Sequence, residues 1–395
     1  MTDVTPAALR ALGGLKWTGY EPDVLPAWVA EMDFGLAPAV AEALHAAVDR
    51  GNTGYHYPAA EDEAAVAATG FWSDRFHWDV DPSHVFPAPD VIEGIRRAIV
   101  HLTEPGSAVV LHTPVYFPFF SMVERAGRDI AGVSSLRDGQ GRYRLDVDGI
   151  EKALAAGAGS IVLCNPWNPT GRSLSEAEIT EVLDVARSRG ARVITDEVHG
   201  PLTLSGATHT VAANLDPELV VTVTSASKAW NLPGLKCAQV VLTNPRDREV
   251  WEGYFTPYIV GVSTFGLIAN AAAYSHGREW LDGVVIRLQA NRQLLDELMA
   301  KLMPGVGYQS PEATYLAWLD FTGYRLDDPA EFLLEKARVA LASGPPFGEG
   351  GRGHARLNFA TPAPILGEIV ERMAGALDGL SQTGEKSSGF DFPLA

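Results

Sequence analysis

Short apolar runs alternate with longer amphipathic stretches through the middle of the chain, from about residue 90 to residue 245. The runs lie at residues 108–111, 160–164, 193–195, 219–223 and 238–242. Short β-branched runs of this kind predict buried strands, and the stretches between them predict helices. Their alternation favours an α/β fold with a mostly parallel sheet covered by helices. In such folds ligands are held by loops at the carboxyl ends of the strands.

The two ends of the chain have other patterns. Residues 1–35 are too apolar for a free tail, so we expect them to pack as an arm. Helical patterns at 265–303 and 328–342 enclose a strand pattern at 314–321, and a further strand is expected at 355–359. These patterns predict a smaller α+β domain. The expected organisation is an arm and first helix packing with the small domain (1–45), a large domain (46–275), a small domain (276–380) and a polar tail (381–395).

The charge balance limits the possible partners. The chain has 31 basic and 49 acidic residues, which gives a net charge of −18. A charge of this sign repels a nucleic-acid backbone and an anionic membrane surface, so neither is an expected partner. No run approaches the roughly 18 apolar residues of a membrane-spanning helix, and the first residues lack the pattern of a signal peptide. We therefore expect a cytoplasmic protein.

The cysteines and histidines do not indicate a metal site. Cys164 and Cys237 are the only cysteines, and both lie in apolar, strand-like runs. Such positions predict buried reduced thiols and not a disulfide or a metal site. The ten histidines show no paired spacing typical of metal ligands.

Lys228 is the most informative residue for chemistry, because it lies just beyond the predicted strand at 219–223. A lysine amine becomes a nucleophile when burial and a nearby positive charge lower its pKa toward neutrality. Lys236 is placed in the sequence to supply such a charge. The alternative for Lys228 is an ordinary solvated surface lysine.

Asp196 and Asn168 follow two other predicted strands. Asp196 ends an apolar run, so its carboxylate needs a cationic partner at the mouth of the sheet. A protonated pyridine nitrogen is one such partner, while a helix cap or a surface ion pair is the alternative. Asn168 belongs to a sharply turned segment with two Asn-Pro pairs, at 165–171, and its amide could donate to an anionic oxygen. Ordinary turn formation explains the same residue types.

A predicted helix start could bind phosphate. Asp90 and Glu93 have the spacing of a capping box, and the amides near Val91 and Ile92 would be free at the first turn. The carboxylate of Asp90 would, however, compete with a phosphate for these amides and repel it.

Two more side chains are candidates for ligand binding. Tyr116 lies in an aromatic run after a predicted strand and could stack on a planar cofactor, although core packing explains such a run equally well. Arg356, on the predicted strand of the small domain, could bind a carboxylate through two parallel hydrogen bonds or form a structural salt bridge. The Gly-rich segment 348–353 matches the residue pattern of a dinucleotide-binding fingerprint. We do not expect such a site, because the fingerprint requires a helix after it and a strand is predicted there.

Three motifs in fixed order resemble the cofactor signature of the class I/II aminotransferases. They are Asn-Pro-x-Asn-Pro-Thr-Gly at 165–171, Asp-Glu-Val-His at 196–199 and Ser-x-Ser-Lys at 225–228. The resemblance runs from about residue 17 to residue 375. It is strongest to the cystathionine β-lyase-like C–S lyases, through the phrases at 25–34, 54–58, 235–238 and 356–362.

This resemblance implies a fold type I enzyme that uses pyridoxal 5′-phosphate and is a homodimer with shared active sites. Lys228 would bond covalently to the cofactor, Asp196 would pair with the pyridine nitrogen, and Arg356 would bind the carboxylate of an amino-acid substrate. Other contacts to the cofactor are implied for Asn168, Tyr116, His199, Ser225, Ser227, Lys236, Val91, Ile92 and, from the neighbouring chain, Tyr55. His199 and Lys236 replace a tyrosine and an arginine of many aminotransferases, as is familiar in the lyase branch, whereas Asp90 stands where that branch usually has a small residue.

The resemblance favours β-elimination from cystathionine or another S-substituted L-cysteine, which yields a thiol, pyruvate and ammonia. Transamination between an amino acid and a 2-oxo acid would use the same residues, as would another fate of the same carbanion on a cysteine conjugate. A cofactor-binding regulatory protein is a further alternative.

Overall fold

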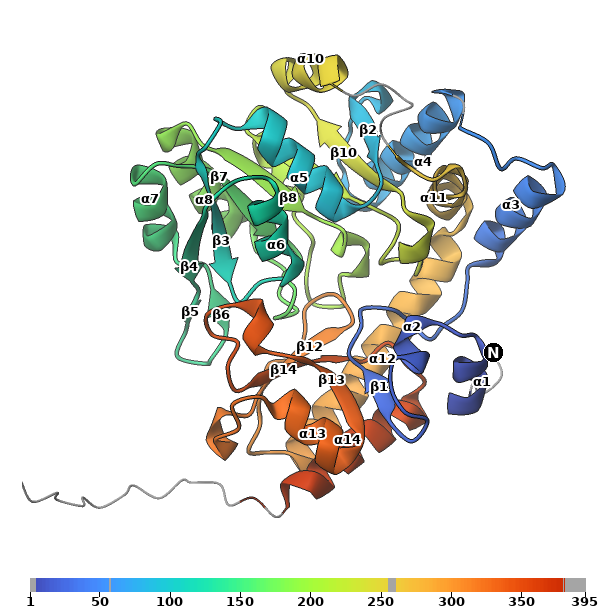
Figure 1. The fold of residues 1–395 in the computed structure, drawn as a ribbon, viewed down its shortest axis with the longest axis vertical. Coiled ribbons are helices and arrows are strands. Elements are labelled where there is room, and N and C mark those ends of the chain that lie inside the picture. The colour runs from blue at the N-terminus through green and yellow to red at the C-terminus, as the bar shows by residue number, and fades with distance from the viewer. Residues whose placement is uncertain (1–4, 57, 255–260, 379, 381–395) are drawn as a thin grey trace, which may run out of the picture.

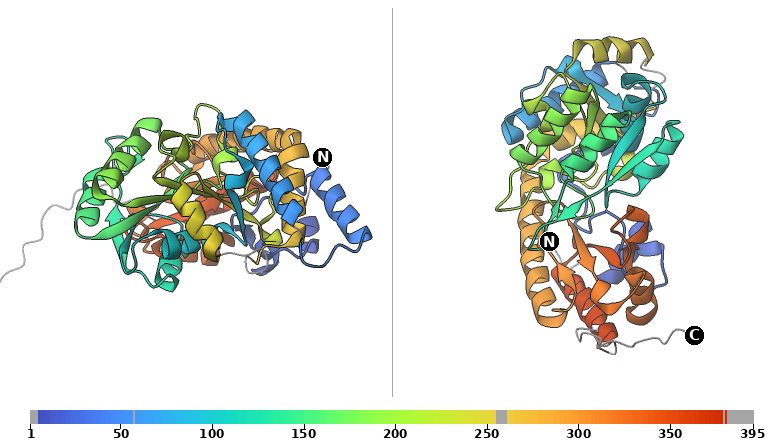
Figure 2. Two further views of the ribbon diagram at one scale, coloured as in Figure 1. Left: turned by 90° about the horizontal axis from the view of Figure 1, so that it is seen from above. Right: turned by 90° about the vertical axis from the view of Figure 1, so that its left-hand side faces the viewer.

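The computed structural model describes residues 5–56, 58–254, 261–378 and 380, so the polar tail predicted at 381–395 lies outside the described residues. Figure 1 shows two layered regions: a seven-stranded sheet with its helices, and a five-stranded sheet with helices beside it. The long helix α12 (Arg278–Leu302) runs along both regions, as Figure 2 also shows.

The seven-stranded sheet has the order β2-β10-β9-β8-β7-β3-β4. All its pairs are parallel except those of β10, which is antiparallel to both β9 and β2. The predicted mostly parallel α/β sheet is therefore confirmed. Its strands are β2 (Val85–Ala88), β3 (Ala108–Thr113), β4 (Ile130–Ser134), β7 (Ala158–Cys164), β8 (Arg192–Asp196), β9 (Val220–Thr224) and β10 (Ala238–Leu242).

Helices cover both faces of this sheet. Successive side chains of a strand point to opposite faces, so alternate residues of one strand pack into different cores. Val109 and Leu111 of β3 pack with helices α5 and α6, whereas Val110 between them joins the core on the other face. The helices around this sheet are α4 (Pro58–Phe76), α5 (Val91–Leu102), α6 (Pro118–Arg125), α7 (Val147–Ala155), α8 (Glu176–Arg189), α9 (Ala212–Leu215), α10 (Pro245–Tyr254) and α11 (Thr264–His276).

The five-stranded sheet joins the two ends of the chain. Its order is β1-β13-β14-β12-β11, and β1 of the N-terminal arm pairs in parallel with β13. The arm is therefore joined to the smaller sheet through β1, whereas the first long helix, at 38–49, packs against α11 of the large region. The strands are β1 (Leu25–Ala27), β11 (Gly307–Tyr308), β12 (Leu316–Asp320), β13 (Val339–Ser343) and β14 (His354–Asn358), with helices α13 (Pro329–Ala337) and α14 (Ala363–Leu377). The remaining elements are α1 (Pro6–Ala11), α2 (Leu15–Thr18), α3 (Pro38–Asp49) and the small hairpin of β5 (Leu136–Arg137) and β6 (Tyr143–Arg144).

Two predicted helices have other boundaries in the structure. The helix predicted at 328–342 ends at Ala337, since Arg338 takes a left-handed conformation (φ 55°) and β13 follows it. The pairing of β13 with β1 and β14 outweighs the helix propensity of its alanines and leucine. The pattern at 265–303 forms α11 and α12, which meet at Gly277. A Cβ there would lie 2.5 Å from the indole nitrogen of Trp230, so no side chain fits.

The described residues hold neither a membrane-spanning helix nor a metal site. None of their helices combines the length and apolar character required to cross a membrane. They contain no group of histidine, cysteine and acidic side chains that could hold a metal ion. Cys164 and Cys237 are both buried free thiols, as predicted.

Candidate active site

A cavity of about 200 Å³ lies at the carboxyl ends of β7, β8 and β9. It brings together ten of the predicted site residues: Val91, Ile92, Tyr116, Asn168, Asp196, His199, Ser225, Ser227, Lys228 and Lys236. A second cavity of about 400 Å³ shares Ala30, Tyr116 and Lys228 with the first and adds Arg356. Tyr55 lines neither cavity and is 88% exposed. The geometry thus gathers every predicted site residue except the one expected to come from a neighbouring chain.

Asp196 is a buried acid without a cation in direct contact within the described residues. It ends β8, and its Oδ1 accepts a hydrogen bond from the Val198 amide at 3.1 Å. Burial raises the pKa of Asp196 to about 7, although Val198 and the charge of Lys228 oppose this rise. Such a carboxyl group is prepared for a ligand that brings a positive charge or a proton donor into the cavity.

Lys228 lies opposite this acid, just beyond β9. Its Nζ donates to the backbone carbonyl of Ala30 at 3.0 Å. Burial and then the positive charge of Arg356 lower the pKa of Lys228 to about 8. The prediction that Lys236 supplies this charge was wrong, because the Lys236 ammonium pairs with Asp90 at 2.9 Å. An amine with such a pKa is partly unprotonated slightly above neutral pH, and this fraction is available as a nucleophile or base.

Arg356 has no acidic partner among the described residues, so the structural salt bridge considered for it is not observed. Its Nη1 donates to Asn168 Oδ1 and its Nη2 to the Trp28 carbonyl, each at 2.9 Å, while the buried Nε has no acceptor. Burial lowers the pKa of Arg356 to about 10, which leaves it charged at neutral pH. A buried guanidinium with an unused donor is suited to an anionic ligand such as a carboxylate.

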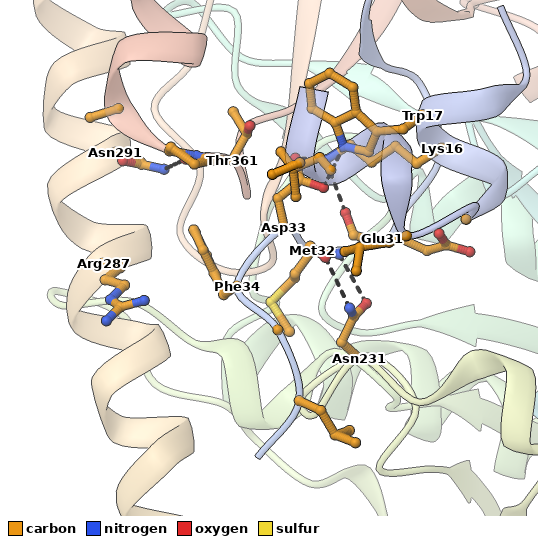
Figure 3. A pocket seen from close by; sticks show the side chains of 18 of the residues that line it. Lys16, Trp17, Glu31, Met32, Asp33, Phe34, Asn231, Arg287, Asn291 and Thr361 are labelled. Atoms are coloured by element: carbon orange, nitrogen blue, oxygen red, sulfur yellow. Dashed lines mark hydrogen bonds and ion pairs between the residues drawn. The ribbon is translucent and has the colours of Figure 1, made fainter. Parts of the chain in front are cut away.

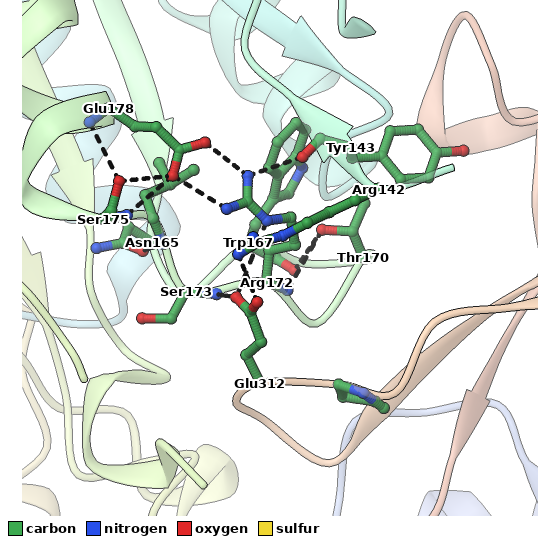
Figure 4. Close-up of polar contacts among 12 residues, drawn as sticks. Arg142, Tyr143, Asn165, Trp167, Thr170, Arg172, Ser173, Ser175, Glu178 and Glu312 are labelled. Carbon is green, nitrogen blue, oxygen red and sulfur yellow. Dashed lines mark hydrogen bonds and ion pairs between the residues drawn. The ribbon is translucent and has the colours of Figure 1, made fainter. Parts of the chain in front are cut away.

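A buried ion-pair network holds the loop that carries Asn168 (Figure 4). Arg172, four residues further on, donates to both carboxylate oxygens of Glu178 at 2.8 and 3.0 Å and to the Tyr143 carbonyl at 2.7 Å. Its Nε lies 3.9 Å from Glu312 Oε2. Burial raises the pKa of Glu178, but the hydrogen bonds from Arg172 and Ser175 and the charge of Arg172 together outweigh this effect and hold it at about 2. The network makes the loop rigid and so fixes Asn168 against Arg356.

The segment 28–33 of the arm forms another wall of the site, and it lies within the phrase at 25–34 that carries the resemblance to the lyases. The Ala30 carbonyl accepts from Lys228 and also from the Tyr315 hydroxyl, at 2.9 Å. Asn231 clamps the same segment, because it accepts from the Met32 amide and donates to the Met32 carbonyl, both at 2.9 Å (Figure 3). The sequence signal that could have revealed Asn231 is its place three residues after Lys228.

Behind this arm lies a larger cavity of about 1040 Å³, drawn in Figure 3. None of the predicted site residues lines it. Its wall contains a buried ion pair between Lys16 and Asp33 at 2.7 Å, and the Trp17 indole donates to the same carboxylate at 2.8 Å. These contacts lie within the arm and hold residues 16 and 17 against residue 33.

His199 and Tyr116 complete the first cavity. Burial lowers the pKa of His199 well below its usual range, so the ring is neutral, and its buried Nδ1 has no partner among the described residues. Tyr116 packs edge-on against Phe119 at 5.7 Å between ring centres. Phe119 is fully buried, which fits the core-packing alternative for that residue, whereas Tyr116 lines both cavities.

The predicted phosphate contacts surround the start of α5. Asp90 caps this helix, as predicted, by accepting from the Glu93 amide at 2.9 Å. The Ser225 hydroxyl donates to the Cys237 carbonyl at 2.7 Å and accepts from the Ser227 amide at 3.0 Å. Ser225 therefore has its proton engaged already and could act toward a phosphate only if it gave up that bond.

Comparison with known proteins places this geometry in a family. The sequence profile described as aminotransferase class I and II matches residues 28–373. The chain is 41% identical to a cystathionine β-lyase of Corynebacterium glutamicum, over 92% of this chain and 96% of that protein. It is 34% identical to the cystathionine β-lyase PatB of Bacillus subtilis, over 90% and 93%.

The fold is shared with solved structures as well. The PLP-bound C–S lyase of Staphylococcus hominis matches with a TM-score of 0.86 and 25% identity, covering 93% of this chain and 96% of that one. The predicted fold, that of type I pyridoxal-phosphate enzymes, is confirmed. This chain belongs to the class I and II aminotransferase family.

Proposed function

We propose that this protein is a pyridoxal 5′-phosphate-dependent C–S β-lyase that cleaves cystathionine or another S-substituted L-cysteine to a thiol, pyruvate and ammonia. The observation that carries the proposal is the pair of cavities that share Lys228, with Asp196 lining the first and Arg356 the second. The identity to proteins named cystathionine β-lyase supports the lyase reaction over transamination.

The donors and acceptors of the cavity fit the cofactor. Asp196, with its pKa raised to about 7, would gain a hydrogen-bonded cation from a protonated pyridine nitrogen. Asn168, the unpartnered Nδ1 of His199 and the ring of Tyr116 line the space around the same cavity, and the helix start with Val91 and Ile92 offers amides to a phosphate. Ser227 and Lys236 would contribute a hydroxyl and a positive charge.

The residues of this chain would then act on the amino acid as follows. Arg356 holds the α-carboxylate, for which its buried Nε and its Nη2 are the available donors. When bound, pyridoxal phosphate takes up the electron pair that is left on the α-carbon. Lys228 Nζ, as a free amine, accepts the α-proton, and its lowered pKa favours this role. The thiolate leaves from the β-carbon, and addition of water releases pyruvate and ammonia.

We also propose that the active form is a homodimer, in which Tyr55 of the partner subunit completes the phosphate site. The support is that Tyr55 is 88% exposed and does not line the cavities of its own chain. The division into an arm with the first helix (1–45), a large domain (46–275) and a small domain (276–380) is part of the same proposal, supported by the two separate sheets.

The test is to incubate the purified protein with cystathionine and with S-alkyl and S-aryl cysteines, without any 2-oxo acid. Pyruvate and free thiol in equal amounts are expected, and Lys228→Ala is expected to abolish both. If no pyruvate forms but amino transfer occurs once a 2-oxo acid is added, the protein is an aminotransferase. A Lys228→Ala variant with full lyase activity would overturn the assignment of the catalytic lysine.

A further inference from the structure

Asp90 occupies two groups that a cofactor phosphate would need. One of its carboxylate oxygens, Oδ2, lies 2.9 Å from Lys236 Nζ. The other, Oδ1, accepts the amide of Glu93 in the first turn of α5. Asp90 and Lys236 both line the cavity that contains Lys228.

The cap leaves part of the helix start open. Asp90 uses the amide of the third helical residue, Glu93, whereas the amides of Val91 and Ile92 have no hydrogen-bond acceptor among the described residues. Both residues line the cavity. A phosphate on these two amides would therefore lie beside the Asp90 carboxylate instead of replacing its cap.

This arrangement puts two anions on one cation. A phosphate at the helix start would be attracted by Lys236, whose charge Asp90 already balances, and would be repelled by Asp90 itself. The ion pair is only partly shielded, because the side chains of Lys236 and Asp90 are 59% and 38% exposed. Solvent and salt should therefore weaken the competition without removing it.

We propose that Asp90 is a built-in competitor of the cofactor phosphate, which holds Lys236 in the cofactor-free protein and lowers the affinity for pyridoxal phosphate. This inference rests on the cofactor of the proposed function but not on the choice between lyase and aminotransferase. Its consequence is an enzyme that releases and rebinds its cofactor more readily than it would with a neutral residue at this position.

The test is to titrate cofactor-free wild type and Asp90→Asn with pyridoxal phosphate and to follow the absorbance of the bound cofactor. Asparagine caps a helix as well as aspartate does, so the substitution removes the charge and keeps the cap. Equal melting temperatures of the two cofactor-free proteins would confirm that α5 is intact. The Kd of Asp90→Asn is expected to be about tenfold lower, as for a close, partly screened charge pair.

Two further measurements identify the cause. Pyridoxal without its phosphate should bind both proteins equally, and the difference for pyridoxal phosphate should shrink as salt is added. Lys236→Gln should weaken binding more in the Asp90→Asn background than in wild type, because Lys236 is no longer neutralised there.

Several results would overturn the inference. One is an unchanged or higher Kd for pyridoxal phosphate in Asp90→Asn. Another is a Kd for pyridoxal that falls in Asp90→Asn by the same factor as the Kd for pyridoxal phosphate. If pyridoxal phosphate bound to neither protein, the proposed function would fail together with this inference. Binding to both with equal affinity would refute the role of Asp90 alone.

Discussion

Replacing Asp196 with asparagine should make the cofactor-free protein more stable at neutral pH, although it removes a residue that we place in the active site. The asparagine side chain would keep an oxygen for the Val198 amide, so the hydrogen bond of 3.1 Å can persist. What the substitution removes is a buried acid whose pKa is raised to about 7, chiefly by burial. Such a site is organised for its ligand and not for the stability of the empty protein.

The sign follows from proton binding. Between the unfolded pKa of 3.8 and the folded pKa of about 7, the native state holds a proton that the unfolded state has lost. Stability of the wild type therefore falls as pH rises through this window, by about 1.36 kcal/mol per pH unit. From about pH 5 to about pH 7 the loss amounts to about 2 kcal/mol, because the folded group is itself half deprotonated near pH 7, and this loss is absent in Asp196→Asn.

Other groups do not disturb the comparison. Lys228, with its pKa lowered to about 8, is protonated in both states over most of this range. His112 and His199 are buried with lowered pKa values, so they make stability rise with pH in the acid range. They are present in both proteins, and their effect cancels in the difference.

The assay is urea unfolding of both cofactor-free proteins, followed by tryptophan fluorescence at about pH 5 and about pH 7. The advantage of Asp196→Asn over wild type should grow by about 2 kcal/mol between the two pH values. If the advantage is the same at both, the raised pKa of Asp196 is refuted. With cofactor added, the order should reverse, since the variant lacks the anion that would pair with the pyridine nitrogen.

Three other substitutions test the supports of the site. Arg172→Met leaves Glu178 without its cation, while Glu312 keeps its ion pair with Arg142, and the substitution should cost about 1–3 kcal/mol of stability in thermal unfolding. A loss no larger than that of a surface substitution would show that the network is not structural. Arg356→Lys keeps the positive charge but loses the planar pair of donors, so KM for the amino acid should rise about tenfold with a smaller change in kcat. If the variant and the wild type have equal KM values, Arg356 does not bind the substrate carboxylate. Asn231→Gly removes both hydrogen bonds to Met32, but glycine can still adopt the φ of 58°. Asn231→Ala removes the same bonds and adds backbone strain of about 1 kcal/mol. Limited proteolysis should therefore cut the arm faster in both variants, and faster in Ala than in Gly, whereas full protection would contradict the clamp.

The sequence alone was sufficient for the five inner strands of the large sheet and for the polar residues at their carboxyl ends, whereas the outer strands β2 and β4 were not predicted. Asp196, Asn168 and Lys228 each follow a β-branched run, and the carboxyl ends of parallel strands meet along one edge of a sheet. Local pattern therefore predicted which polar side chains share the cavity. The same locality explains the cap of α5 at Asp90, since Asp90 and the Glu93 amide are three residues apart. The reciprocal half of the predicted capping box does not form, because the Glu93 carboxylate binds Arg96 and Arg97 instead.

Contacts between distant parts of the chain could be found only in the tertiary structure. Lys228 and the Ala30 carbonyl are 198 residues apart, and Arg356 lies 328 residues from the Trp28 carbonyl that it binds. Such pairs leave no periodic trace in the sequence, because each partner only has to be compatible with its own strand or loop. For the same reason β13 was mistaken for the end of a helix, since its strand conformation depends on pairing with β1. Lys236 was the wrong choice for the charge that lowers the pKa of Lys228, because Arg356 supplies that charge. Burial and neighbouring charge are properties of the assembled fold and cannot be deduced from positions along the chain.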